Sequence, residues 1–180
     1  MHPNPPQPDR RSFLTKAAAV LIGAVSVLIP TAAGLRVFFD PLRRRSQNSE
    51  MSWVAMLDAL PEDGSPRKFN VVADRSDAWN RTPQVPIGAV YLRRTGEKSV
   101  QALNVVCPHA GCFVDYTAES KCYFCPCHNS KFKLDGTIDD PKSPTPRALD
   151  ELQVEVRNDA EVWVKYESYL AGRREKVRIA

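Results

Sequence analysis

Two short boxes rich in cysteine and histidine constrain this chain more than any other feature. The first, C-P-H-A-G-C, begins at Cys107 and places His109 two residues later. The second, C-P-C-H-N-S-K-F, begins at Cys125 and places His128 three residues later. Together the boxes hold four of the five cysteines and two of the three histidines. Thiolates and imidazoles in paired loops are the ligands of a metal centre.

The distribution of ligands between the boxes distinguishes between metals. Structural zinc sites usually take C-x2-4-C and H-x3-5-H, with two like ligands in each arm. Here each arm carries one thiolate and one imidazole, so both arms supply one of each to a centre between them. This set suits a [2Fe–2S] cluster with two cysteines on one iron and two histidines on the other. A structural zinc site remains the alternative.

The two boxes resemble, position by position, those of Rieske iron–sulfur proteins, usually written C-x-H-x-G-C and C-P-C-H-x-S. The resemblance implies that Cys107 and Cys125 hold one iron, and that His109 and His128 hold the other and are the working ligands. Histidine ligation leaves the cluster less negative than four thiolates would. It therefore accepts an electron more readily, with potentials of roughly −150 to +300 mV across the class.

The same resemblance assigns roles to neighbouring residues. Cys112 and Cys127, one in each box, are expected to form a disulfide that ties the two loops together. Ser130 is expected to donate a hydrogen bond to a bridging sulfide. Asn129 stands where glycine is usual, and Asn tolerates a left-handed backbone better than most residues. Cys122 is left over, and we expect a free, partly buried thiol there; a zinc or mispaired-disulfide arm with Cys125 is the alternative.

Phe132 is a departure from the high-potential members of the family, which carry a tyrosine there whose hydroxyl bonds a ligand-cysteine sulfur. Hydrogen bonds to the sulfurs favour the reduced, more negative cluster. A hydrogen bond to a charged acceptor contributes about 1.5–3 kcal/mol, but only the part that differs between redox states shifts the potential. Because about 59 mV corresponds to a tenfold change for one electron, we expect a potential lowered by several tens of millivolts. Such a potential suits menaquinol rather than ubiquinol.

The positive charge of the chain belongs to its amino-terminal part. Residues 1–45 carry seven Lys and Arg against Asp9 and Asp40, a net charge of +5, so the remainder carries −1 of the total of +4. No basic patch with interleaved aromatic residues lies near the boxes, and we expect no nucleic-acid partner.

The amino terminus predicts a targeting signal and an anchor. Residues 1–9 are polar and proline-rich and are expected to be disordered. Arg10 and Arg11, followed by Phe13, Leu14 and Lys16, resemble a twin-arginine export signal. Residues 17–35 lack charge, and with the apolar run to residue 39 they are long enough to span a bilayer. Removal of this segment by cleavage is the alternative.

The predicted organisation has four parts. Residues 1–16 form a cytoplasmic tail with the twin-arginine signal, 17–39 a transmembrane anchor, 40–56 a tether and 57–180 a Rieske domain. Where the tether meets the domain, residues 52–60 are expected to form one or two helical turns. The export signal and the expected disulfide place the domain outside the cytoplasm, on the periplasmic face of the inner membrane.

Short strands broken by turn residues predict an all-β domain. Candidate strands are 68–73, 87–93, 100–106, 154–157 and 162–166, the last two forming a hairpin around Asn158 and Asp159. By resemblance, this is an antiparallel base with a cluster-binding subdomain at about 105–147. Residues 141–147 contain three prolines, which make the loop stiff; in the family such a loop covers the cluster, and the alternative is a rigid connector.

The resemblance also implies a function. The chain looks like the iron–sulfur subunit of a cytochrome bc-type quinol:cytochrome c reductase, with a quinol as donor and cytochrome b-type and c-type subunits as partners. A soluble Rieske subunit of an arsenite-oxidase-like molybdenum enzyme is the main alternative. A ring-hydroxylating dioxygenase ferredoxin is disfavoured because such ferredoxins lack the extra cysteine pair and the export signal. An anchored zinc-binding interaction module is a third reading and predicts a colourless protein.

Overall fold

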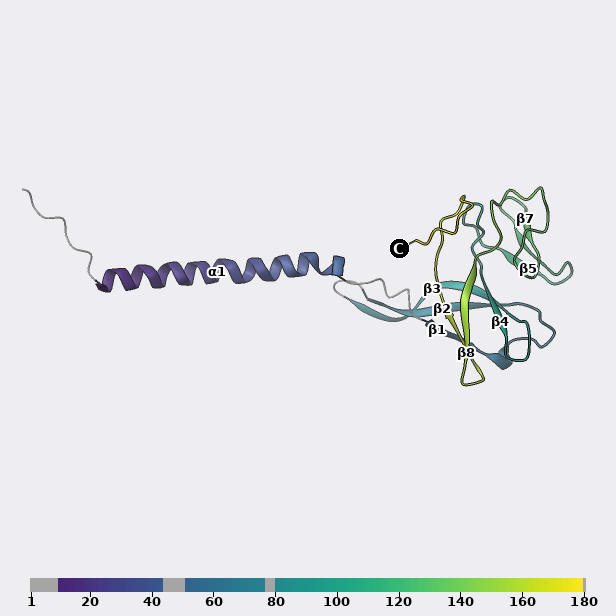
Figure 1. Cartoon of the computed structure of the whole chain (residues 1–180), viewed down its shortest axis with the longest axis horizontal. Coiled ribbons are helices and arrows are strands. Elements are labelled where there is room, and N and C mark those ends of the chain that lie inside the picture. Colours follow the sequence, from purple (N-terminus) through teal and green to yellow (C-terminus); the bar gives the residue numbers. More distant parts are fainter. Residues whose placement is uncertain (1–9, 44–50, 77–79, 180) are drawn as a thin grey trace, which may run out of the picture. The chain divides into compact units, whose positions relative to one another are not determined.

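A computed structural model describes residues 10–43, 51–76 and 80–179. The chain divides into two compact units, residues 1–45 and residues 46–180 (Figure 1). Residues 1–9, for which disorder is expected, lie outside the described residues, as do residues 44–50 of the predicted tether.

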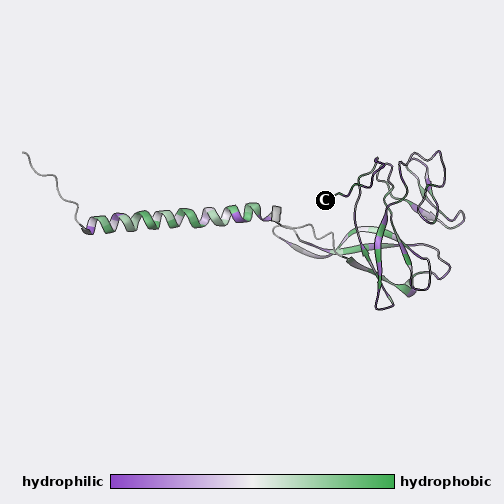
Figure 2. Ribbon diagram, in the orientation of Figure 1, coloured by the Kyte–Doolittle hydropathy of each residue, from purple (hydrophilic) through white to green (hydrophobic). Residues whose placement is uncertain are grey.

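The first unit contains one helix, α1 (Arg10–Arg43). Its segment Arg11–Asp40 is long and apolar enough to cross a membrane, and the predicted span 17–39 lies within it. Figure 2 shows the apolar residues along its length. Large apolar side chains such as Val20 and Phe38 are more than 70% exposed, which is unfavourable in water and favourable in lipid. The helix continues past Pro30, where the Thr31 hydroxyl donates to the Val27 carbonyl at 2.7 Å.

The second unit is built of antiparallel strands, which confirms the all-β expectation. Six strands form one sheet in the order β1-β9-β8-β4-β3-β2. The strands of this sheet are β1 (Met51–Met56), β2 (Arg67–Ser76), β3 (Arg81–Arg94), β4 (Val100–Asn104), β8 (Glu151–Arg157) and β9 (Glu161–Lys165). β1 and β2, at the two ends of this order, also contact each other. The sheet therefore curls around one apolar core, as closing sheets do.

Strand β1 corrects the expectation of a helical turn or two at residues 52–60. Residues 51–56, the end of the predicted tether 40–56, form a strand that pairs with β9, with Met51 opposite Lys165 and Trp53 opposite Trp163. Only Leu57–Ala59 form a helical turn, the 3-10 helix η2. An irregularity in register between Trp53 and Ala55 leaves Val54 and Ala55 both buried. It breaks the alternation of apolar and polar residues by which a strand is recognised in sequence.

Strand β3 is longer than predicted, because it includes Pro83 and Pro86. Its pairing with β4 covers only Val90–Arg94, whereas its pairing with β2 extends back to Arg81. The prolines therefore lie where β3 has a neighbour on one side only. A missing amide donor is tolerated there, as on an edge strand.

The hairpin of β8 and β9 agrees with the prediction. Val154 lies opposite Val164 and Val156 lies opposite Val162, so all four share the face that packs on the core. Asn158 and Asp159 have φ values of +49° and +59°, a left-handed conformation that Asn and Asp adopt more readily than other non-glycine residues.

A smaller sheet carries the boxes. It consists of β5 (Asp115–Thr117), β6 (Cys122–Cys125) and β7 (Ser130–Phe132), in that order. In Figure 1 it lies at the end of the domain away from the β8–β9 turn. A second apolar core lies under it and includes Cys107, Cys125 and Phe132, separate from the core of the large sheet.

Gly88 provides a test of the packing inside the large sheet. A Cβ atom added at Gly88 would lie 2.1 Å from Cζ and the hydroxyl oxygen of Tyr166, which is itself buried. We expect Gly88→Ala to lower the free energy of unfolding by about 1–3 kcal/mol, because the overpacked ring has to move. Chemical denaturation of the domain measures this change.

The matched control is Gly96→Ala. An added Cβ there meets Ser99 at an ordinary 3.4 Å, so the free energy of unfolding should change by less than about 0.5 kcal/mol. Equal unfolding midpoints for the two variants would contradict the packing described for Gly88.

Candidate metal centre

The first box is a tight loop that follows β4. The Cys107 amide donates to the Cys112 carbonyl at 2.7 Å, and the Gly111 amide donates back to the Cys107 carbonyl at 2.9 Å. Gly111 has a φ of +81°, which glycine adopts without steric cost. These bonds bend the chain so that His109 stands at the turn, while Cys107 remains completely buried.

The second box is the turn of the β6–β7 hairpin. Cys125 pairs with Ser130, which leaves the four residues between them, His128 included, to make the turn. Asn129 has a φ of +58°, so this position is left-handed. An asparagine serves there in place of the usual glycine.

The structure brings the four expected ligands together as two pairs that differ in burial. Cys107 and Cys125 are 0% and 1% exposed, whereas His109 is half-buried and His128 is exposed. The imidazole rings lie edge to face, with centroids 4.6 Å apart. The site therefore has a sulfur side turned inward and a nitrogen side turned toward solvent.

Two buried polar atoms in the site have no hydrogen-bond partner among the described residues: Nδ1 of His109 and the hydroxyl oxygen of Ser130. Leaving a buried polar atom unsatisfied costs about 1–3 kcal/mol, so each such atom calls for an explanation. A metal on Nδ1 and an acceptor beside the hydroxyl would satisfy both. The residues present therefore fit a bound metal cluster.

The Cys107 thiol is held neutral by its surroundings. Burial raises its pKa most, and the neighbouring Cys125 thiol raises the pKa further, while the hydrogen bond from the His109 amide lowers it. A neutral buried thiol has to lose its proton to bind a metal, so loading of the site releases protons.

The structure contains the expected disulfide between Cys112 and Cys127, whose Cα atoms are 6.6 Å apart. The Cys125 sulfur lies within 4.8 Å of both disulfide sulfurs. Because disulfide sulfurs are not thiolates, these three atoms do not form a second metal site. The bridge instead fastens the two loops directly beside the inner side of the centre.

Cys122 is buried and free, as expected. Its sulfur lies 3.1 Å from the Ser120 hydroxyl oxygen, and it starts β6 opposite Thr117. It is a structural thiol of the small sheet.

Phe132 is completely buried in the same core as Cys107 and Cys125. It pairs with Tyr123 across β6 and β7 and with Ile138 beyond the next turn. That turn contains Gly136, with a φ of +86°, a conformation that glycine adopts without steric cost.

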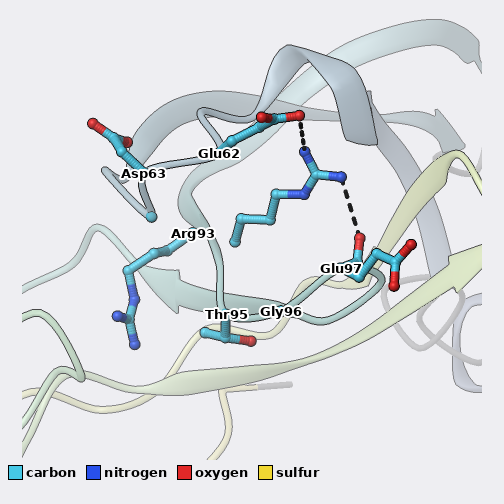
Figure 3. A pocket seen from close by; sticks show the side chains of 8 residues that line it. Glu62, Asp63, Arg93, Thr95, Gly96 and Glu97 are labelled. Atoms are coloured by element: carbon cyan, nitrogen blue, oxygen red, sulfur yellow. Dashed lines mark hydrogen bonds and ion pairs between the residues drawn. The ribbon is translucent and has the colours of Figure 1, made fainter.

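The polar hollow drawn in Figure 3 lies apart from these residues. It is formed by the turn after η2 and the β3–β4 turn and is lined by Glu62, Asp63, Gly64, Arg93, Arg94, Thr95, Gly96 and Glu97. Arg94 pairs with Glu62 at 3.6 Å and donates to the Glu97 carbonyl at 3.2 Å. None of the expected ligands lines it.

Sequence reasoning missed two supports of the site. The Tyr91 hydroxyl, on β3, donates to the Val114 carbonyl at 3.3 Å and accepts the Tyr116 amide at 3.0 Å, which fixes the chain after the first box. The segment after β9 reaches the first box, where the Gly172 amide donates to the Pro108 carbonyl at 2.8 Å. Neither has a short-range signal in the sequence, because both contacts join distant residues.

Comparison with known proteins decides the family. Residues 52–156 match the family described as "Rieske [2Fe-2S] domain". The chain belongs to the Rieske family. Its cofactor is therefore a Rieske-type [2Fe–2S] cluster, and its role is electron transfer.

Curated relatives resemble the Rieske chain over most of its length. The menaquinol:cytochrome c reductase iron-sulfur subunit of Geobacillus thermodenitrificans is 31% identical, covering 88% of this chain and 92% of the relative. The subunit of the same name from Bacillus subtilis (strain 168) is 30% identical, covering 83% and 87%. The cytochrome b6-f complex iron-sulfur subunit of Chlorobaculum thiosulfatiphilum is 27% identical, covering 84% and 73%.

The disulfide of this Rieske domain is open to a direct test. Its cysteines are 15 residues apart, and a cross-link over a loop of that length contributes about 3 kcal/mol. We expect the double variant Cys112→Ser, Cys127→Ser to lose roughly this much stability locally. Amide hydrogen exchange of β6 and β7 should accelerate accordingly, while that of β8 and β9 stays unchanged.

Cys122→Ser is the control, because it changes a buried cysteine of the same small sheet without removing a covalent link. Exchange in β6 and β7 that is no faster in the double variant than in Cys122→Ser would show that the bridge does not hold the small sheet.

Proposed function

We propose that this chain is the iron–sulfur subunit of a menaquinol:cytochrome c reductase. It takes an electron and a proton from menaquinol and passes the electron to a c-type cytochrome. The observation that carries the proposal is the pair of imidazoles at the surface above two buried thiols. The names of the two relatives at 30–31% identity support it.

In this proposal the ligands divide as their burial suggests. Cys107 and Cys125 would hold one iron of the cluster, and His109 and His128 would hold the other. When bound, the cluster would supply a one-electron acceptor. The buried, unpartnered Nδ1 of His109 supports its role as a ligand atom. Ser130, buried beside them, donates its hydroxyl hydrogen to the cluster.

The outer imidazoles bind the quinol. A quinol hydroxyl donates a hydrogen bond to the ring nitrogen of His128 or His109 that faces solvent. That nitrogen takes one proton when the first electron leaves the quinol; the second electron and the second proton of the quinol go to acceptors outside this chain. The exposure of His128 supports this role.

Residues 141–147 keep water from the inner side of the centre. Thr145 within this loop is buried, and its hydroxyl donates to the Arg147 carbonyl at 2.8 Å. Three prolines restrict the backbone of the loop, so it serves as a rigid cover.

Helix α1 anchors the subunit in the membrane, and Arg10 and Arg11 form a twin-arginine export signal that carries the folded domain out of the cytoplasm. The domain then lies on the periplasmic side, joined to the anchor through residues 44–50. Cytochrome b-type and c-type subunits are its partners, as the quinol:cytochrome c reductase and cytochrome b6-f names of the relatives suggest.

Phe132 is the residue that favours menaquinol. It lies in the core that contains both ligand cysteines, at the position where the high-potential members have a tyrosine. Without that hydroxyl the sulfurs lack one donor, and the reduced cluster is less stabilised. A lower potential matches a more reducing quinol.

The experiment that tests the proposal is a spectroscopic redox titration of the full-length protein at several pH values. We expect a Rieske signal with a midpoint in the lower part of the class range, falling as the pH rises, because reduction is accompanied by proton uptake on the imidazoles. A midpoint at the top of the range would overturn the menaquinol assignment. A colourless protein without an iron–sulfur signal would overturn the whole proposal.

Phe132→Tyr tests the cause of the low potential. The new hydroxyl would be buried beside the ligand sulfurs and would donate to one of them. We expect the midpoint to rise by several tens of millivolts, since about 59 mV corresponds to a tenfold stabilisation of the reduced form. Tyr123→Phe is the control, because it alters a buried hydroxyl of the same core that has no partner among the described residues. Equal midpoints for Phe132→Tyr and the unaltered protein would show that residue 132 does not set the potential.

A further inference from the structure

The segment that follows β9 lies against the first box. It starts at Glu167, and its Gly172 amide donates to the Pro108 carbonyl at 2.8 Å, one residue before His109. Gly172 has a φ of +75°, and a Cβ there would lie 3.6 Å from the His109 carbonyl oxygen. The segment thus touches the backbone that carries a proposed ligand.

Arg147 holds this segment in place. Its Nη1 donates to the carbonyls of Leu170 at 3.1 Å and Arg173 at 2.6 Å, on either side of Gly172. Its Nε and Nη2 donate to the two carboxylate oxygens of Asp150 at 3.0 and 2.7 Å. The side chains of Arg147 and Asp150 are only 11% and 6% exposed. A bidentate ion pair of this kind fixes the orientation of the guanidinium as well as its position.

Asn104 connects this arrangement to the other end of the first box. The backbone amide of Asn104 donates to the Asp150 carbonyl at 2.8 Å, and its side-chain amide donates to the Glu167 carbonyl at 3.1 Å. Its side-chain oxygen accepts the Val106 amide at 3.0 Å, next to Cys107. Asn104 is 1% exposed. Hydrogen bonds therefore reach the box on both sides of Cys107, at Val106 and at Pro108.

We propose that Arg147 is a positioning residue for the cluster ligands. Together with residues 167–173, here named the C-terminal clasp, it fixes the backbone of the first box and with it the direction of the His109 ring. The proposal rests on the proposed ligand role of His109 and is independent of which quinol is oxidised.

The geometry explains why an arginine is required. Four acceptors, two carboxylate oxygens and two carbonyls, surround one planar group, and a guanidinium supplies fixed donors to all of them. A lysine has one nitrogen and cannot reach both Asp150 and the clasp in the same way. Apart from the clasp, residues 108–111 are held by the turn bonds within the box and by the disulfide that follows. Without the clasp, the backbone of residues 108–111 becomes more mobile, and the ring of His109 becomes more mobile with it.

The test compares the full-length protein, purified in detergent with its cluster, with the variant Arg147→Gln. We expect the variant to lose its visible absorbance about tenfold faster, as removal of a support behind metal ligands generally weakens metal binding by this order. The electron paramagnetic resonance lines of the reduced protein should broaden, and the midpoint potential should shift. Arg147→Lys should restore the charge and leave the lines broad.

A chain ending at Ala171 tests the clasp without disturbing the pair of Arg147 and Asp150. It lacks the Gly172 amide and the Arg173 carbonyl. We expect faster cluster loss and faster hydrogen exchange of residues 105–113, the latter also in the cluster-free chain. If Arg147→Gln does not fold, cluster loss and hydrogen exchange in the shortened chain test the proposal instead.

Arg157→Gln is the matched control. Arg157 also donates two hydrogen bonds to a carboxylate, that of Glu155, but in an exposed pair at the β8–β9 turn. It should leave cluster retention and line shape unchanged. Unaltered cluster retention, line shape and midpoint in folded Arg147→Gln, or in the shortened chain, would overturn the proposal. Absence of a cluster from the unaltered protein would instead contradict the function proposed above.

Discussion

The steep change in burial between the cysteines and the histidines is the constraint on which the rest of the domain depends. The proposed function requires two thiols in a dry core and two imidazoles of the same two loops that reach solvent. A single loop cannot satisfy both demands, because a loop short enough to be rigid cannot also cross from core to surface twice. Two loops from separate parts of the chain, joined by the disulfide between Cys112 and Cys127, can do so.

The two apolar cores follow from this demand. The larger one inside the curled sheet provides a stable base and contains none of the proposed ligands. The smaller one contains Cys107, Cys125 and Phe132, and it is supported by a disulfide and by hydrogen bonds from Tyr91, Asn104 and Arg147. A core of this size has few apolar residues, so covalent and polar links replace part of the hydrophobic contribution.

The sequence predicted local features well and long-range ones poorly. The boxes, the hairpin around Asn158 and Asp159, and the disulfide all depend on short motifs or on family resemblance. β1 was missed because its irregularity hides the strand period, and because its partner, β9, is more than 100 residues away. The clasp was missed for the same reason: an isolated Arg147 and a Gly172 carry no pattern until the fold brings them together. The unpartnered atoms of His109 and Ser130 are likewise visible only in three dimensions.

Strand β1 has a mechanical consequence for a subunit held by its amino-terminal end. The chain enters the domain at Met51 and is paired with β9 from its first residue. Tension applied to the chain at Met51 is therefore borne by the β1–β9 ladder and passed to the large sheet. The small sheet of β5, β6 and β7 pairs with neither of these strands. A pull on Met51 would therefore load the ladders of the large sheet before those of the sheet that carries the second box.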